Sequence, residues 1–251
     1  MTLDLEVVRA RLPGREIHWF ETIDSTMPKA ARLAALGCPS GTVVGAEQQT
    51  AGQGRLGRKW HSEPDAGLYV SLVLRPDCTE ESLPVLTLAT GLAVQEAILG
   101  ACGLVCDLRW PNDLLLDAKK CAGILLQIEP SAVVAGIGIN VNHTSLPADL
   151  TATATSLRLA AGREISRTAL LVALVEAVDH YSHLLSTQGP ESILRLFSQA
   201  STYVSGRRVR VEQGDQQLEG VTAGLDSSGF LLLRRPDGRI CQVLAGGVRP
   251  V

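Results

Sequence analysis

The chain is organised around one glycine-rich, cationic stretch, Gln48-Gln-Thr-Ala-Gly-Gln-Gly-Arg-Leu-Gly-Arg-Lys-Trp-His-Ser62. The residues that stand out are three glycines, three cations and one indole: Gly52, Gly54, Gly57, Arg55, Arg58, Lys59 and Trp60. Glycine lets backbone N–H groups come close to a ligand, and arginine offers a planar set of donors for a carboxylate or a phosphate. The stretch therefore predicts a loop that binds an anionic, partly planar ligand.

The glycines of this stretch match the spacing G-x-G-x-x-G, which in dinucleotide-binding proteins opens a helix. Here the third glycine leads into Arg-Lys-Trp-His-Ser-Glu-Pro-Asp-Ala-Gly67, which is too rich in helix breakers. The sequence therefore argues against a Rossmann fold, and it contains no Walker A motif. Two further interpretations are a nucleic-acid contact and an idle surface loop. The acidic balance argues against the first, and the entropic cost of ordering such a loop argues against the second.

The composition indicates a mildly acidic globular protein. The 251 residues are 45% hydrophobic and carry a formal net charge of −3, enough for one large core or a main domain with a small one. A global basic field, typical of nucleic-acid binders, is excluded. Residues 1–12 carry two acids and two arginines, so we expect no secretory signal. We also expect no membrane segment, because no apolar run approaches the ~20 residues required.

The six cysteines include no Cys-x-x-Cys pair. Reduced thiols in a cytoplasmic protein are the expected state. Cys102 and Cys106 could share a metal, but no second pair or nearby histidine completes such a site.

Hydrophobic periodicity predicts an α+β fold, with a mixed or antiparallel central sheet flanked by helices. Strands are expected over residues 16–20, 42–47, 68–74, 106–110, 114–116, 121–128 and 132–141. Helices are expected over residues 4–12, 30–36, 82–99, 166–185 and 190–200, the second of them capped within residues 24–26. Gly136 and Gly138 interrupt the last strand, which indicates either a close approach to the backbone or a bulge.

The pattern changes near Ser205. Short alternating runs follow over residues 208–212, 217–223, 230–234 and 240–244, separated by turns such as Gln213-Gly-Asp. Several short strands at close spacing predict a small antiparallel barrel. We therefore expect two domains, residues 1–204 and 205–251.

A second informative stretch is Arg109-Trp-Pro-Asn-Asp-Leu-Leu-Leu-Asp-Ala-Lys-Lys-Cys-Ala-Gly-Ile-Leu125. Asn112 and Asp113 follow an apolar strand and a proline, where a carboxylate can hold a metal or orient an amine. Lys120 begins another apolar strand, so its charge acts in a dry setting. Simple turn chemistry and a snorkelling lysine remain alternatives for each residue alone. Their joint occurrence with the glycine loop favours a site.

Three motifs in this order resemble biotin protein ligase, also called biotin–[acetyl-CoA-carboxylase] ligase: Gln-Thr-Ala-Gly-Gln-Gly-Arg-Leu-Gly-Arg-Lys-Trp60, Arg-Trp-Pro-Asn-Asp-Leu with Lys-Lys-Cys-Ala-Gly-Ile-Leu125, and Gly-Ile-Gly-Ile-Asn-Val-Asn142. The resemblance extends from about Asp24 to the C-terminus. It implies a class II synthetase-like catalytic domain and a C-terminal SH3-like barrel. It also implies that ATP and biotin form biotinyl-5'-AMP, from which biotin passes to a lysine of the biotin carboxyl carrier protein of acetyl-CoA carboxylase. Since one anion attacks another, such catalysis is mostly positioning and charge neutralisation, with Mg²⁺ and without a covalent enzyme nucleophile.

The resemblance also implies residue roles. Biotin would be bound by Ser25, Thr26, Met27, Gln49, Gly52, Gln53, Gly54, Arg55, Lys120, Gly123, Gly136 and Gly138. The nucleotide would be bound by Arg55, Arg58, Lys59, Trp60, Asn112, Lys120 and Asn140, with Mg²⁺ near Asn112 and Asn140. The catalytic residues would be Arg55, Lys120 and Asp113, of which Asp113 would orient the incoming lysine amine and is the candidate general base.

Two departures from the family pattern bear on function. The family loop often reads Gly-Arg-Gly-Arg, whereas this chain has Gln53 in place of the first arginine. Only about twenty residues precede Asp24, too few for a DNA-binding helix-turn-helix. We therefore expect a monofunctional ligase that does not bind DNA. The alternatives are a lipoate–protein ligase and a biotin-responsive DNA regulator, and the sequence leaves open whether the chain is a monomer or a homodimer.

Overall fold

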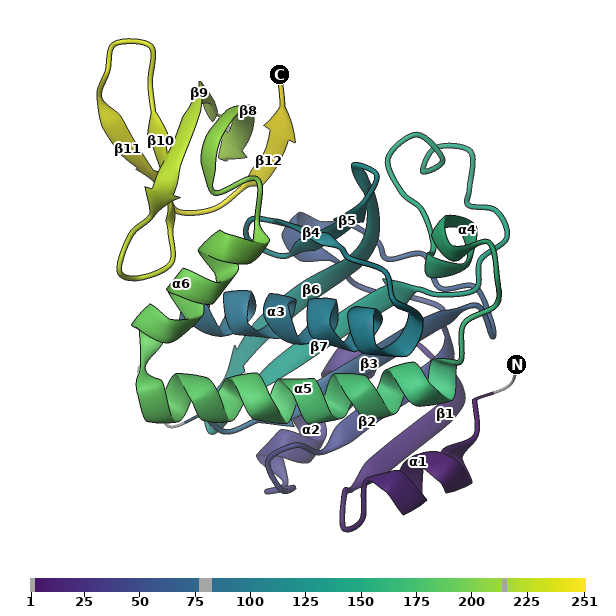
Figure 1. The fold of residues 1–251 in the computed structure, drawn as a ribbon. Helices are drawn as coiled ribbons and strands as arrows, with labels where there is room; N and C mark the ends of the chain where they lie inside the picture. Colours follow the sequence, from purple (N-terminus) through teal and green to yellow (C-terminus); the bar gives the residue numbers. More distant parts are fainter. Residues whose placement is uncertain (1–2, 77–82, 214–215) are drawn as a thin grey trace.

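The computed structural model describes residues 3–76, 83–213 and 216–251 and contains two β-sheets (Figure 1). Ser82, where the third predicted helix begins, lies outside the described residues, as do Cys78 and the Gly214-Asp215 part of a predicted turn. The five cysteines that are described are free.

The larger sheet has seven strands in the order β1-β2-β3-β7-β6-β5-β4. Its strands are β1 (Ile17–Ile23), β2 (Val43–Gln49), β3 (Gly67–Leu74), β4 (Asp107–Arg109), β5 (Asp113–Leu116), β6 (Lys119–Glu129) and β7 (Ala132–Asn140). Only the pair β1–β2 is parallel, and the other neighbours are antiparallel. This mixed sheet with helices on it confirms the predicted α+β class.

Most helices cover one face of this sheet and build the main core. The helices are α1 (Leu5–Arg11), α2 (Thr26–Ala35), α3 (Leu83–Cys102), α4 (Leu157–Ala161), α5 (Arg167–Gln188) and α6 (Pro190–Ala200). The core side includes α3, α5 and α6, and α3 packs against both α5 and the sheet (Figure 1). The short helix α4 is absent from the sequence prediction, because five residues carry too little periodicity.

Helix α3 corrects one expectation. The stretch Pro84–Cys102 has a mean hydropathy of 1.6 and is long and apolar enough to span a membrane by composition alone. The expectation that no run approaches this length is therefore wrong. However, 61% of the stretch is buried inside the fold. Its apolar character is explained by packing between the sheet and α5, as in the core helix of a globular domain.

Helix α2 covers only part of the opposite face. Its residues Met27, Ala30 and Ala34 form a second, smaller cluster with Val73 and Val134. Side chains alternate between the two faces of a strand. On β7 the positions that follow Val134 on this face are therefore Gly136, Gly138 and Asn140, and Gly136 lies beside Met27 of α2.

The smaller sheet begins at Ser205 and is entirely antiparallel, in the order β11-β10-β9-β8-β12. Its strands are β8 (Ser205–Gln213), β9 (Gln216–Leu225), β10 (Leu231–Arg234), β11 (Ile240–Val243) and β12 (Gly247–Pro250). The four predicted runs are present. The fifth strand, β12, was missed because it is short and ends in proline. Trp110 joins the two units, since its Nε1 donates to the carbonyl of Gly229 at 2.9 Å.

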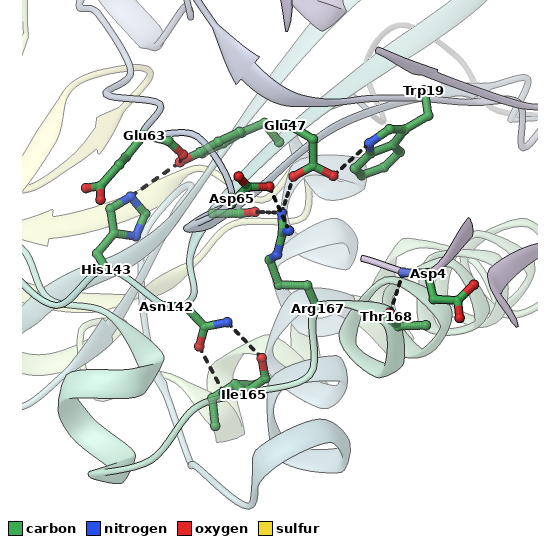
Figure 2. A network of polar contacts seen from close by, with 12 residues as sticks. Asp4, Trp19, Glu47, Glu63, Asp65, Asn142, His143, Ile165, Arg167 and Thr168 are labelled. Carbon is green, nitrogen blue, oxygen red and sulfur yellow. Dashed lines mark hydrogen bonds and ion pairs between the residues drawn. The ribbon is translucent and has the colours of Figure 1, made fainter. Parts of the chain in front are cut away.

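A fully buried arginine ties α5 to the larger sheet (Figure 2). Arg167 Nη1 lies 2.5 Å from Glu47 Oε2 and donates to the carbonyl of Gly67 at 3.3 Å. The other oxygen of Glu47 accepts from Trp19 Nε1 at 3.0 Å. Because a buried charge is tolerated only when paired and hydrogen-bonded, this network holds β1, β2 and α5 together.

The substitution R167M tests this network. It leaves the Glu47 carboxylate buried without its cation, so we expect the free energy of unfolding to fall by about 3–5 kcal/mol in urea denaturation. The exposed pair of Arg210 and Glu219, at 2.7 Å, provides the control, because R210M should cost no more than about 1 kcal/mol. An equal loss in both variants would contradict the structural importance of the buried pair.

Candidate active site

The glycine loop folds as a closed turn and not as the start of a helix. Gly54 N donates to the carbonyl of Arg58 at 2.7 Å, and Trp60 N donates to the carbonyl of Gly52 at 2.9 Å. Between them lies a single helical turn, Arg55–Gly57, in which Leu56 and Gly57 have φ of +58° and +71°. No helix follows in residues 58–66, which confirms the argument against a dinucleotide-binding fingerprint.

The loop lies over the glycine-bearing face of the sheet and encloses a small pocket. The pocket is lined by Ser25, Thr26, Met27, Gln49, Gln53, Gly54, Arg55, Trp60, Val70, Asn112, Lys120, Gly123, Ile124, Leu125, Gly136, Ile137 and Gly138. Its free volume is about 40 Å³, against about 300–1,000 Å³ for pockets that hold small molecules. A bound ligand therefore requires one of the lining side chains to move.

The floor of the pocket is made of strand backbone. Gly123 on β6 pairs directly with Gly138 on β7, and the pairing of β7 with both neighbours runs through Gly136 and Gly138 without a register shift. The glycines therefore mark a close approach and not a bulge. A Cβ on Gly138 would lie 2.4 Å from the Trp60 indole, and one on Gly136 would lie 2.4 Å from Met27 Sδ. Thus Trp60 rests on the bare backbone of the floor.

One end of the pocket is polar. Ser25 caps α2 by accepting from Met27 N. Thr26 donates from its backbone N to Gln49 Oε1 at 2.9 Å, and its hydroxyl lies 2.8 Å from Ser71 Oγ. Gln49 Nε2 in turn donates to Ser62 Oγ. This network presents fixed hydroxyl and amide groups, which can pair with a ligand that carries both donors and acceptors.

The other end of the pocket is charged. Asp113 Oδ1 lies 2.5 Å from Lys120 Nζ, and its Oδ2 lies 2.7 Å from Arg109 Nη2. Burial by itself would raise the pKa of Asp113, but the two cations outweigh it and lower that pKa below its ordinary value. Arg55 Nη1 donates to Asn112 Oδ1 at 2.6 Å, and Asn112 Nδ2 donates to the carbonyl of Ile124 at 3.0 Å. The two cations Arg55 and Lys120 are thereby held at the pocket's edge.

A larger, cationic cleft continues from this edge. It has a free volume of about 440 Å³ and shares Gly54, Arg55, Trp60, Asn112 and Lys120 with the small pocket. The remaining lining is Leu56, Arg58, Lys59, His61, Arg109, Asp113, Ala118, Asn140, Leu146, Leu150, residues 152–154 and residues 246–250. The cleft therefore lies between the glycine loop, the loop after β7 and the last strand, and its charge suits a polyanion.

The structure brings together nearly all residues that the sequence predicted for a site. Every one of them lines the pocket or the cleft except Gly52, where a Cβ would lie 2.8 Å from the Trp60 carbonyl oxygen. Gly52 thus permits the turn of the loop and does not face the pocket. Sequence reasoning missed Leu125 and the β12 contribution of Arg249. It also missed Val70, Ile124 and Ile137, which border the pocket although their side chains belong to the main core on the other face of the sheet. The alternation along β6 is the signal that could have placed Leu125 on the same face as Gly123.

Both parts of the chain are similar to known proteins. Residues 19–143 match the Biotin/lipoate A/B protein ligase family, and residues 204–248 match the Biotin protein ligase C terminal domain. The chain is 34% identical to the bifunctional ligase/repressor BirA of Bacillus spizizenii, covering 92% of this chain and 73% of that protein. It is 31% identical to biotin–[acetyl-CoA-carboxylase] ligase of Mycobacterium tuberculosis, and the match covers 98% of this chain and 95% of that protein. A solved biotin protein ligase from Aquifex aeolicus, in complex with biotin and ATP, superposes with a TM-score of 0.84 at 30% identity. The superposition covers 94% of this chain and 99% of that one.

Adding a methyl group to the floor tests the position of Trp60. In G138A the new Cβ conflicts with the indole, so we expect a red-shifted tryptophan emission and a loss of about 1–3 kcal/mol in stability. The red shift should vanish when G138A is made in a W60F background. G100A serves as the matched control, because a Cβ there meets nothing within 4 Å. Unchanged emission in G138A would contradict the contact.

Proposed function

Since the chain belongs to the biotin/lipoate A/B protein ligase family, we infer that it is an ATP-dependent biotin–[acetyl-CoA-carboxylase] ligase. The observation that carries this inference is the continuity of the two spaces. A polar-ended pocket with a glycine floor opens into a cationic cleft, and Arg55, Asn112 and Lys120 lie on their common border. Such a border is where a carboxylate from one side can meet a phosphate from the other.

The first half-reaction follows from this arrangement. Biotin's ring system occupies the glycine floor with its polar ring edge toward Thr26 and Gln49, and its carboxylate lies at the border. A carboxylate oxygen attacks the α-phosphorus of ATP, and pyrophosphate leaves. Arg55 and Lys120 offset the repulsion between the two anions, which is the main barrier that the protein can lower. Their positions are set beforehand by Asn112 and Asp113, so little reorganisation is needed.

In the second half-reaction a neutral lysine amine attacks the carbonyl carbon of the mixed anhydride, the bond from that carbon to the phosphate oxygen breaks, AMP leaves, and the surplus amine proton passes to solvent. We assign Asp113 to orienting this amine. Its lowered pKa makes it a weak base, so the structure gives less support to general-base catalysis by Asp113 than to orientation. Arg109 and Lys120 keep the carboxylate ionised, which is the state that binds an ammonium or a polarised amine.

Mg²⁺ would accompany ATP into the cleft, and its charge would neutralise part of the phosphate charge there. Asn112 Oδ1 is already bonded to Arg55. Asn140 commits its Nδ2 to the carbonyl of Thr155 at 3.0 Å, so its oxygen is the atom it can offer to a cation. This donor set fits an ion held chiefly by phosphates, as Mg²⁺ commonly is. Of the two predicted asparagines, Asn140 is therefore the better candidate.

The remaining assignments rest on the same site. Arg58 and Lys59 contact the phosphates, and Trp60 leaves the floor to cover the adenylate. The acceptor is a biotin carboxyl carrier protein that docks at the open mouth of the cleft.

We propose residues 1–204 as the catalytic domain and residues 205–251 as the C-terminal domain. We also propose a cytoplasmic location, which the free thiols support. We also propose that the chain does not bind duplex DNA, in line with its net charge of −3.

Lipoate ligation is the nearest alternative, because the family includes it. The polar end formed by Thr26, Gln49 and Ser71 favours biotin, whose ureido ring needs such partners, over the mostly apolar lipoate. ATP–pyrophosphate exchange that depends on biotin is the direct test. Exchange supported by lipoate and not by biotin would overturn the assignment.

The substitution K120A should abolish most biotin-dependent exchange, because it removes a cation from the border where the two anions meet. The fold should persist, with a free energy of unfolding within about 1 kcal/mol of that of the unmodified chain, because Asp113 keeps Arg109 as its partner. K119A is the matched control: Lys119 is the neighbouring lysine, and its Nζ instead donates to the carbonyl of Thr151. Comparable exchange rates in the two variants would contradict the role of Lys120.

The substitution D113A should separate the two half-reactions. Lys120 keeps its charge, so biotinyl-AMP formation is retained in part, whereas transfer from preformed biotinyl-AMP to a carrier domain falls more strongly. D149A, in the exposed loop after β7, controls for loss of an acid near the cleft. If exchange and transfer fall by the same factor, Asp113 does not orient the amine.

A further inference from the structure

Three side chains that can bind a metal converge where the glycine loop ends. His61 and Glu63 follow Trp60 on the loop, and His143 follows β7. One ring nitrogen of each histidine and one carboxylate oxygen of Glu63 all lie within 4.8 Å of one another. Figure 2 shows the Glu63 carboxylate beside the His143 ring. His61 also lines the cationic cleft, but no reaction step assigned above uses any of the three side chains.

His143 is the fixed member of this group. Its side chain is fully buried, and its backbone carbonyl accepts from Ser156 Oγ at 2.7 Å. His61 and Glu63 are exposed, so their side chains can adjust. Ligand atoms around a tetrahedral zinc ion lie about 3.3 Å apart. Rotation of the two exposed side chains toward the fixed imidazole can shorten the present separations of up to 4.8 Å to that value.

The hydrogen bonding of His143 leaves one ring nitrogen without a partner. The phenol of Tyr69 donates its one proton to the carbonyl of Glu63 at 3.0 Å. The contact of 3.3 Å between Tyr69 Oη and His143 Nε2 then has the imidazole as donor. Nδ1 is left with a lone pair and has no partner in the described part of the chain.

This state is the one that suits a metal ligand. Metal-binding histidines commonly donate one ring N–H to a protein acceptor and use the other nitrogen for the metal. The Tyr69 contact thus fixes the orientation of the ring and leaves Nδ1 as the nitrogen without a protein partner in the described part of the chain.

We propose that His61, Glu63 and His143 form a binding site for a divalent transition-metal ion of the zinc type, distinct from the site of the Mg²⁺ that accompanies ATP. Two imidazoles and one carboxylate match the ligand preference of Zn²⁺ or Co²⁺, whereas Mg²⁺ prefers oxygen ligands. The ion joins the end of the glycine loop to the end of β7. It therefore fixes the segment next to Trp60 without taking part in the reaction.

Metal titration of the full chain tests the proposal. Protein stripped with a chelator is titrated with Co²⁺, followed by its visible absorption, and with Zn²⁺, followed by calorimetry. We expect one ion per chain, no displacement by excess Mg²⁺, and binding at least about tenfold weaker in H61A and in E63Q, since even outer partners of a metal site contribute that much. Both residues are exposed, so neither substitution threatens the fold.

H183A is the matched control, because His183 is an exposed histidine of α5 remote in sequence from the group. It should bind both ions as the unmodified chain does. All variants keep the same cysteines, so binding through thiols would persist in H61A and E63Q. Equal affinity in the unmodified chain and in H61A, or no binding to the unmodified chain, would overturn the proposal.

Discussion

Gly123 and Gly138 face each other across β6 and β7, and the pocket exists because neither has a side chain. An ordinary strand would fill this face with alternate side chains, as the core face of β7 does with Ile137 and Ile139. Without them, a ring can lie flat on the backbone. Helix α2, the glycine loop and the polar end at Thr26 are all placed around this bare patch, so the constraint organises the remainder of the site.

Charge at the site is organised by the Asp113 carboxylate between two cations. At an effective dielectric constant of about 20, one such pair at 4 Å is worth about 4 kcal/mol. The attraction of two such pairs exceeds the free-energy cost of desolvating Asp113, which explains why its pKa falls although burial alone would raise it. The consequence for catalysis is that Lys120 is already charged and positioned. An anion that arrives at the border exchanges one carboxylate partner for another and does not have to order a flexible lysine.

The sequence predicted the order and type of most elements because their periodicity is long, and it placed most site residues through motifs. What it could not supply depends on contacts distant in the chain. Arg249 and the other β12 residues reach the cleft through pairing of β12 with β8. Gly52 does not line the pocket, because the carbonyl oxygen of Trp60 lies where its side chain would be. The apolar run of α3 was underestimated because Thr87, Thr90 and the pair Gln95-Glu96 interrupt it in the sequence, although the fold buries most of that helix.

Trp60 occupies the floor that a ligand needs, so the free energy of its contact with the floor must be small enough for a ligand to displace the indole. Full burial of an indole of about 150–250 Å² is worth about 4–6 kcal/mol at 25 cal/mol per Å². Trp60 is only half-buried, and its Nε1 is buried without a hydrogen-bond partner among the residues that the structure describes, which costs about 1–3 kcal/mol. The contact with Lys120, 5.3 Å from the ring centroid, offsets part of this. The net hold is therefore small, and a ligand that buries the same glycine floor and satisfies its own polar edge can displace the indole.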